Sequence, residues 1–230
     1  MPSFSVMHGW GGELAAFLLA ASCAGCGEPG RLLCRACTAE LAPVPRVTAT
    51  RAGLTVHAAL AYEGIAARCI RRLKGEGDTL LARPLGAALG TVLHPLIDPC
   101  TWIVPVPTSR SAFRRRGYRV PDLLIRRAGG RPQRVLTVGR RPVDQRGLDA
   151  GQRAANVRGS IRSRRVVEGA RVVLVDDVVT TGATLDEAAR ALDVAGFRVM
   201  SAVALAATPR RAGFGADSSA TPGRHGETGS

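Results

Sequence analysis

Two adjacent acids and a threonine-rich loop stand out in residues 171–184. Asp176 and Asp177 follow an apolar run, Val172–Val175, that is typical of a buried parallel strand, and a helix is expected a few residues later. Two neighbouring carboxylates can hold the vicinal hydroxyls of a ribose or a hydrated Mg²⁺. The backbone N–H groups of the loop, together with a helix N-terminus, can hold a phosphate dianion. The segment therefore predicts a site for a sugar phosphate.

The loop between strand and helix would supply the phosphate contacts through its backbone and its hydroxyls. We expect the helix to start with a capping box formed by Thr184 and Glu187. An ordinary strand–helix turn is the alternative interpretation, but it explains neither the paired acids nor three threonines around one glycine. The residues expected to bind the sugar phosphate are Asp176, Asp177, Thr180, Thr181, Gly182, Ala183 and Thr184.

Four of the six cysteines have the spacing of metal ligands. They form two Cys-x-x-Cys pairs separated by seven residues, and four such thiolates can surround a tetrahedral Zn²⁺ in a closed, structural site. A redox pair would need only one Cys-x-x-Cys, and disulfides are disfavoured because no secretion signal is recognised. Cys69 and Cys100 are expected in the core as small apolar residues. The expected zinc ligands are Cys23, Cys26, Cys34 and Cys37.

Positive charge is concentrated in the middle of the chain. The formal net charge is +14, and residues 101–171 hold 18 arginines but only four acids. This distribution favours a polyanionic partner such as diphosphate or nucleic acid, although any single arginine can also serve solubility alone. No apolar run approaches the length of a membrane span, so we expect no membrane span and a cytoplasmic location.

Composition divides the chain into three parts. Residues 1–45 are expected to form a helix plus the four-Cys module, residues 46–208 an α/β domain, and residues 209–230 a disordered tail. In the middle part, strand-like and helix-like segments alternate, which predicts a parallel sheet flanked by helices with ligands at the carboxyl ends of its strands. The expected strands are residues 54–62, 101–106, 171–175 and 197–205, and the expected helices are residues 64–73, 80–93, 120–127 and 185–195.

The order of these motifs resembles the ComF family, named for a competence protein, whose members join an N-terminal zinc module to a type I phosphoribosyltransferase domain. Residues 171–184 resemble the loop that binds 5-phosphoribosyl-1-diphosphate (PRPP) in such enzymes. The family usually has Asn-Gln where this chain has Arg119-Val120. Besides the cysteines and the loop, the likeness includes Tyr62-Glu63-Gly64, Ile70–Lys74, Pro105–Pro107, Arg116–Tyr118, Arg140, Gln145, Arg153 and Asn156-Val157.

The resemblance implies an α/β fold of the type I phosphoribosyltransferase kind and a Mg²⁺-dependent enzyme that displaces diphosphate from PRPP with an unknown acceptor. Breaking the C1–O bond leaves negative charge on the diphosphate, so the site needs cationic donors. Lys74 and a basic turn at Arg114–Arg116 are the candidates. The expected catalytic residues are Asp176, Asp177, Lys74 and Arg116, and the expected flexible loop that closes over PRPP contains Arg140, Gln145, Arg153 and Asn156.

Two further functions stay open. The family's link to DNA uptake implies a non-catalytic, PRPP-sensing accessory factor that binds single-stranded DNA or a DNA-processing protein. Aromatic residues make up only 4% of the chain, which argues against extensive base stacking, and Tyr118 beside Arg116 is the one plausible platform. A nucleobase salvage enzyme is disfavoured because such enzymes do not need a four-Cys module.

Overall fold

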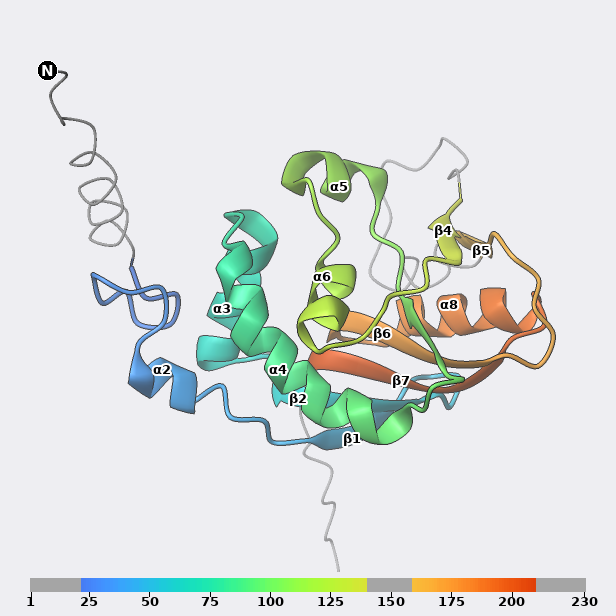
Figure 1. Ribbon diagram of the computed structural model, residues 1–230, viewed down its shortest axis with the longest axis horizontal. Helices are drawn as coiled ribbons and strands as arrows, with labels where there is room; N and C mark the ends of the chain where they lie inside the picture. The colour runs from blue at the N-terminus through green and yellow to red at the C-terminus, as the bar shows by residue number, and fades with distance from the viewer. Residues whose placement is uncertain (1–21, 140–158, 210–230) are drawn as a thin grey trace, which may run out of the picture.

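The structure, a computed structural model, describes residues 22–139 and 159–209 (Figure 1). Within them a five-stranded sheet has the strand order β1-β2-β7-β6-β3. Its strands are β1 (Arg46–Ala49), β2 (Thr55–Ala61), β3 (Trp102–Pro105), β6 (Arg171–Val179) and β7 (Arg198–Ala207). The expected parallel sheet is confirmed for four of these strands, and a short hairpin adds β1 as an antiparallel edge beside β2.

Helices cover both faces of this sheet. α4 (Ala82–Leu93) and α6 (Val120–Arg127) pack on one face, and α8 (Ala183–Asp193) packs on the other. α3 (Gly64–Gly75) lies beside the cysteine segment at one end of the molecule (Figure 1). The other elements of the described residues are α2 (Arg35–Ala39), α5 (Arg110–Arg116), the 3₁₀ turns Thr79–Leu81 and His94–Leu96, and a hairpin of β4 (Leu136–Val138) with β5 (Ile161–Ser163).

The two faces of the sheet belong to two hydrophobic cores. Side chains alternate along β6, so that Val173 and Val175 join the core under α3, α4 and α6, whereas Val172 and Leu174 join the core under α8. All four side chains are fully buried. A strand that is buried on both faces needs a continuous apolar run, which is why the sequence alone indicates this strand.

Two expectations from the sequence are wrong. Arg114–Arg116 is not a turn, because these residues end the helix α5, which begins after the capping residue Ser109. Cys100 is exposed, because it lies in a turn before β3 where its N–H donates to Asp98 Oδ1 at 2.9 Å. Cys69 is buried, as expected.

The ends of the chain carry expectations that lie outside the described residues, namely the N-terminal helix and the tail at residues 210–230. The division of the chain near residue 45 stays a prediction. Across residues 22–139 and 159–209, no helix is long and apolar enough to cross a membrane.

Candidate functional site

The two acids lie inside β6 rather than in the loop after it. The strand continues to Val179 because it pairs with β7 along this stretch, where Asp176 lies opposite Ala204. Alternation along the strand then directs Asp177 to the face of α3 and Asp176 to the face of α8. Both carboxylates are half-buried near the carboxyl end of the strand.

Asp177 pairs with Lys74, which lies at the C-terminal end of α3. Lys74 Nζ is 2.7 Å from Asp177 Oδ1, and their side chains are 28% and 13% exposed. Two groups hold the backbone at this helix end: Tyr118 donates its hydroxyl to the carbonyl of Leu73, and Arg116 Nε donates to the carbonyl of Lys74. Three motifs that are far apart in the sequence therefore converge at one point.

Asp176 has an unusual protonation equilibrium. Burial raises the pKa of its carboxyl to about 7, the negative charge of Asp177 adds to this rise, and the N–H of Asp177 and the ammonium of Lys74 offset it only in part. The Asp177 N–H donates to Asp176 Oδ1 at 2.8 Å. A divalent cation would favour the ionised carboxylates, so the donor set of the two acids fits a hydrated Mg²⁺ held together with a phosphorylated sugar.

The loop after β6 leaves hydrogen-bonding groups open. Gly182 has a φ of +79°, and a Cβ there would lie 2.6 Å from Thr50 Cγ2, so the position requires glycine. Gly182 is the N-cap residue of α8, and no side chain caps the helix; the Ala183 N–H makes a long bond of 3.4 Å to the Thr181 hydroxyl. Backbone N–H groups of the first turn can therefore hold a phosphate. Three threonines of this segment are exposed: Thr180, Thr181 and Thr184.

The expected capping box is wrong. The Glu187 side chain is buried, and it pairs with Arg190, with Nε 2.7 Å from Oε2, and accepts the N–H of Ile161 at 3.2 Å. Burial raises the pKa of Glu187, but these partners outweigh burial and lower it below its usual range. Because β5 lies against α8, the carboxylate turns toward the hairpin and not toward Thr184.

The arginines expected near the diphosphate do not all reach the acids. Arg116 is half-buried beside Lys74, whereas Arg114 and Arg115 are exposed on α5. Tyr118, the expected stacking platform, packs against the hydrophobic core. The residues expected in a closing loop, Arg140, Gln145, Arg153 and Asn156, lie outside the described residues.

A basic pocket beside β3 was missed by sequence reasoning. It is a cavity of ≈ 130 Å³ between Pro105–Thr108, α6 and the β4–β5 hairpin. Its buried acid, Asp122, pairs with Arg134, and Arg119 lies 4.2 Å from the centre of the Phe113 ring. The excess of arginine signals the charge, but the walls come from separate segments whose meeting no local pattern predicts. The lining arginines are Arg110, Arg119, Arg134 and Arg164.

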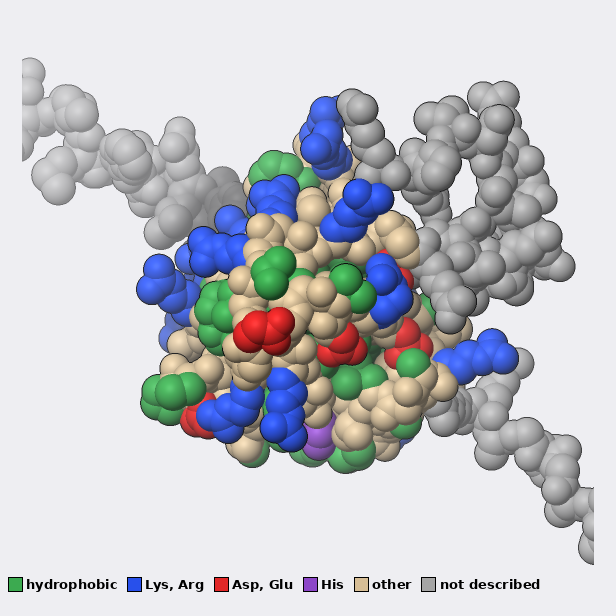
Figure 2. Space-filling model, turned by 90° about the vertical axis from the view of Figure 1, so that its right-hand side faces the viewer, with side chains coloured by type: hydrophobic (Ala, Val, Ile, Leu, Met, Phe, Trp, Pro, Cys, Tyr) green, Lys and Arg blue, Asp and Glu red, His purple; other side chains and the backbone are tan. Residues whose placement is uncertain are grey.

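Basic side chains also gather elsewhere on the surface. Figure 2 shows Lys and Arg side chains both above and below a row of acidic side chains across the middle of one face. Basic side chains therefore surround the acidic ones on this face, in line with the formal net charge of +14.

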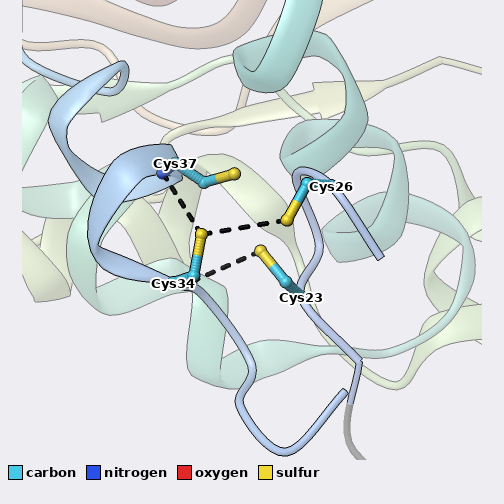
Figure 3. Close-up of side chains that lie close together, drawn as sticks. All are labelled: Cys23, Cys26, Cys34 and Cys37. Carbon is cyan, nitrogen blue, oxygen red and sulfur yellow. Dashed lines mark hydrogen bonds between the residues drawn. The ribbon is translucent and has the colours of Figure 1, made fainter. Parts of the chain in front are cut away.

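The four cysteines expected to hold zinc come together. Their Sγ atoms all lie within 4.8 Å of one another (Figure 3). Cys23, Cys34 and Cys37 are buried, whereas Cys26 is exposed. Four thiolates at these distances fit a tetrahedral ion such as Zn²⁺ and would leave no coordination position for a substrate.

Backbone N–H groups within the module point at the sulfurs. Cys34 N–H donates to Cys23 Sγ at 3.3 Å, Cys37 N–H to Cys34 Sγ at 3.4 Å, and Gly25 N–H to Cys23 Sγ at 3.4 Å. Burial raises the pKa of the Cys23 thiol, but backbone hydrogen bonds outweigh burial and lower it to about 6. Such bonds favour the thiolate form that a metal requires.

Known proteins resemble this chain in part. Residues 115–216 match the family described as "Phosphoribosyl transferase domain". DNA utilization protein YhgH of Salmonella typhi is 35% identical over 95 residues, which cover 39% of this chain and 42% of that protein. Competence protein F of Haemophilus influenzae is 34% identical over 98 residues, which cover 39% of this chain and 43% of that protein.

A third relative is an enzyme by name. Adenine phosphoribosyltransferase of Clavibacter michiganensis is 36% identical over 124 residues, which cover 50% of this chain and 63% of that protein. The chain thus aligns with less than half of the length of the first two relatives and with less than two thirds of the third. The expected type of fold, a phosphoribosyltransferase-like sheet flanked by helices with an N-terminal four-Cys cluster, is confirmed.

Proposed function

We propose that this chain, which carries a phosphoribosyl transferase domain and resembles competence protein F, binds PRPP with Mg²⁺ at the end of β6 and transfers its phosphoribosyl group to an acceptor. The observation that carries the proposal is the pairing of Lys74 with Asp177 at 2.7 Å, next to Asp176 and the uncapped start of α8. The Lys74 ammonium can bind a diphosphate, the two carboxylates can bind sugar hydroxyls or Mg²⁺, and the backbone N–H groups at the start of α8 can bind a phosphate.

Each part of PRPP has a counterpart in this site. The 5-phosphate would accept hydrogen bonds from the backbone and hydroxyls of residues 180–184. The ribose hydroxyls would donate to Asp176 and Asp177, which would also hold Mg²⁺. Bound Mg²⁺ would supply neutralising charge to the diphosphate. Lys74 and Arg116 lie on the α3 side of the acids, and there they would bind the diphosphate.

The proposed reaction exchanges one bond at C1 of the ribose. The C1–O bond breaks and its electron pair leaves with diphosphate, while a lone pair of the acceptor forms the new bond. A proton on the attacking atom of the acceptor is released to water. The Asp176 and Asp177 carboxylates would stabilise the positive charge that builds on the sugar, and the Lys74 ammonium would stabilise the departing diphosphate.

Calorimetric titration with PRPP and Mg²⁺ tests the proposal. We expect saturable binding by the native protein and its loss in the double variant Asp176→Asn/Asp177→Asn, which keeps the shape of both side chains. Asp193→Asn, near the far end of α8, is the matched control because it changes an exposed carboxylate in the same way. Absence of binding by the native protein, or equal binding by the double variant, would reject the site.

The remaining parts of the chain complete the proposal. Residues 1–45 would form a helix plus a module in which Cys23, Cys26, Cys34 and Cys37 hold a structural Zn²⁺, and residues 46–208 would form the transferase domain. Residues 209–230 would form a tail. Elemental analysis of the purified protein should give one zinc per chain, and a value near zero would reject the zinc assignment.

An accessory role without turnover is the second candidate. The basic pocket favours it, because Arg110, Arg134 and Arg164 lie outside the PRPP contacts proposed above and can bind other phosphates. The relatives of this chain include proteins named for DNA utilization and competence. Here PRPP binding would occur without diphosphate release, and a single-stranded oligonucleotide would bind with an affinity that falls steeply with salt. Salt-insensitive binding, or no loss in Arg164→Ala, would reject this role for the pocket.

A further inference from the structure

Arg72 joins the cysteine module to the end of α3. Its Nη1 donates to the carbonyl of Ser22, the residue before Cys23, at 3.0 Å. The same guanidinium pairs with Glu76, with Nε 3.0 Å from Oε2, and with Asp78, with Nη2 2.7 Å from Oδ2. One partly buried side chain therefore connects the first described residue of the module with the turn that follows the helix.

The module also packs closely on the first turn of α3. A Cβ at Gly25, in the knuckle formed by Cys23–Cys26, would lie 2.5 Å from Cys37 Sγ and 3.0 Å from Ile65 Cγ2, so there is no room for a side chain there. Cys23, Cys34 and Cys37 belong to the same hydrophobic core as Ile65, Cys69 and Ile70 of α3. A shift of the knuckle would therefore be transmitted to the helix.

The other end of α3 carries Lys74. The helix has 12 residues and is about 18 Å long, with Ile65 in its first turn and Arg72 and Lys74 in its last. At its C-terminal end the carbonyls of Leu73 and Lys74 accept hydrogen bonds from Tyr118 and Arg116, and the Lys74 ammonium reaches Asp177. Contacts with the module and contacts with the site are thus made by one rigid element.

We infer that the four-Cys module positions Lys74, and that Arg72 is the positioning residue through which it does so. With the four thiolates held together by a metal ion, the knuckle and Ser22 fix both ends of α3, and Lys74 stays beside Asp177. The effect on PRPP rests on the proposed function, whereas the effect on the helix does not. By thermodynamic linkage, PRPP binding should in turn strengthen metal retention.

A double-mutant cycle tests whether Arg72 acts through Lys74. We expect Arg72→Ala to weaken PRPP binding about tenfold while the protein keeps its zinc, which is a coupling of ordinary size. In a Lys74→Ala background the same change should have no further effect. Arg68→Ala is the control, because Arg68 lies one turn earlier by the same module but is exposed, and its side chain makes no hydrogen bond or ion pair with a described residue. An equal loss from Arg72→Ala in both backgrounds would overturn the inference.

Amide hydrogen exchange gives a second readout that does not require PRPP. We expect residues 70–76 to lose protection when zinc is removed with a chelator, and also in zinc-loaded Arg72→Ala but not in Arg68→Ala. Unchanged protection in α3 after complete zinc removal would overturn the inference. If the native protein bound no PRPP, the proposed function would fail, and the exchange measurement would still decide whether the module controls the end of α3.

Discussion

The four-Cys module and the start of α8 after the β6 loop both offer backbone N–H groups as donors, but they differ in what accepts those hydrogen bonds. In the module those N–H groups donate to the chain's own sulfurs, and three of the four thiols are buried. In the loop the start of α8 has no side-chain cap and the threonines are exposed. A closed set of donors and acceptors stabilises the fold, whereas an open set is suited to a ligand from solution.

The same contrast separates the two acids of β6. Asp177 has a cation within the chain, because Lys74 lies 2.7 Å away. The contact described for the Asp176 carboxylate is the N–H of Asp177 at 2.8 Å, and its pKa is raised to about 7. Of the two, Asp176 therefore has more to gain from a cation or hydroxyl supplied by a ligand.

Cys34→Ser should have the largest effect, because it removes one of the four expected zinc ligands from the four-Cys module. Structural zinc contributes on the order of 10 kcal/mol of binding free energy that is coupled to folding. We expect loss of bound zinc and a melting temperature lower by roughly 20–40 °C, at about 2–4 °C for each kcal/mol, measured by elemental analysis and scanning calorimetry. Cys100→Ser is the control, since Cys100 is exposed outside the cluster. Full zinc retention by Cys34→Ser would show that the module is not the metal site.

Lys74→Met tests the proposed contact between Lys74 and the diphosphate of PRPP. This change keeps the length of the side chain but removes the ammonium that is expected to meet the diphosphate. We expect PRPP to bind about 100-fold more weakly and ribose 5-phosphate, which has no diphosphate, to bind nearly as before, because a charged hydrogen bond is worth about 1.5–3 kcal/mol. Calorimetric titration with both ligands measures the difference. An equal loss for the two ligands would place Lys74 away from the diphosphate.

Gly182→Ala tests whether the backbone of the loop after β6 requires glycine at this position. The added Cβ combines a positive φ with a contact of 2.6 Å to Thr50, so we expect a loss of about 1–3 kcal/mol in the free energy of unfolding and weaker PRPP binding. Gly169→Ala is a matched control, because Gly169 also has a positive φ, +71°, but has open space at its Cβ position. Urea denaturation gives the stabilities. Similar losses of stability in the two variants would show that the close contact with Thr50 does not contribute to the effect.

A pH dependence of stability should come from Asp176. Its pKa rises from 3.8 in the unfolded chain to about 7 in the folded one, so between these values the folded protein binds more protons than the unfolded chain. Stability from this group is therefore present at low pH and is lost as the pH rises toward 7. Compared with Asp176→Asn, the native protein should lose stability between about pH 4 and pH 7. The free energy of unfolding of both proteins would be measured by urea denaturation across this pH range. If the two proteins changed in parallel with pH, the raised pKa would be contradicted.

Sequence reasoning worked where one local pattern decides the structure. The run Val172–Val175 indicates β6 because a strand buried on both faces has no polar position. The cysteine spacing indicates a cluster because two short knuckles can fold around one ion. In both cases the residues that matter are close together in the chain, or their type has few other uses.

Sequence reasoning failed where distant segments compete for a residue. Glu187 has the spacing of a capping box, but the N–H of Ile161 in β5 and the nearby Arg190 take its carboxylate. Lys74 and Asp177 are 103 residues apart, so their ion pair depends on how α3 packs and not on a motif. The basic pocket likewise forms only when three segments meet.

Nuclear magnetic resonance of the amide groups tests the contrast between the two regions most directly. Native, zinc-loaded protein would be titrated with PRPP and Mg²⁺ while backbone N–H shifts are followed. We predict the largest shifts at residues 180–184 and far smaller shifts at residues 23–37, where the N–H groups of Gly25, Cys34 and Cys37 already donate to sulfur. Shifts that are absent at residues 180–184, or that are largest in the cysteine module, would contradict it.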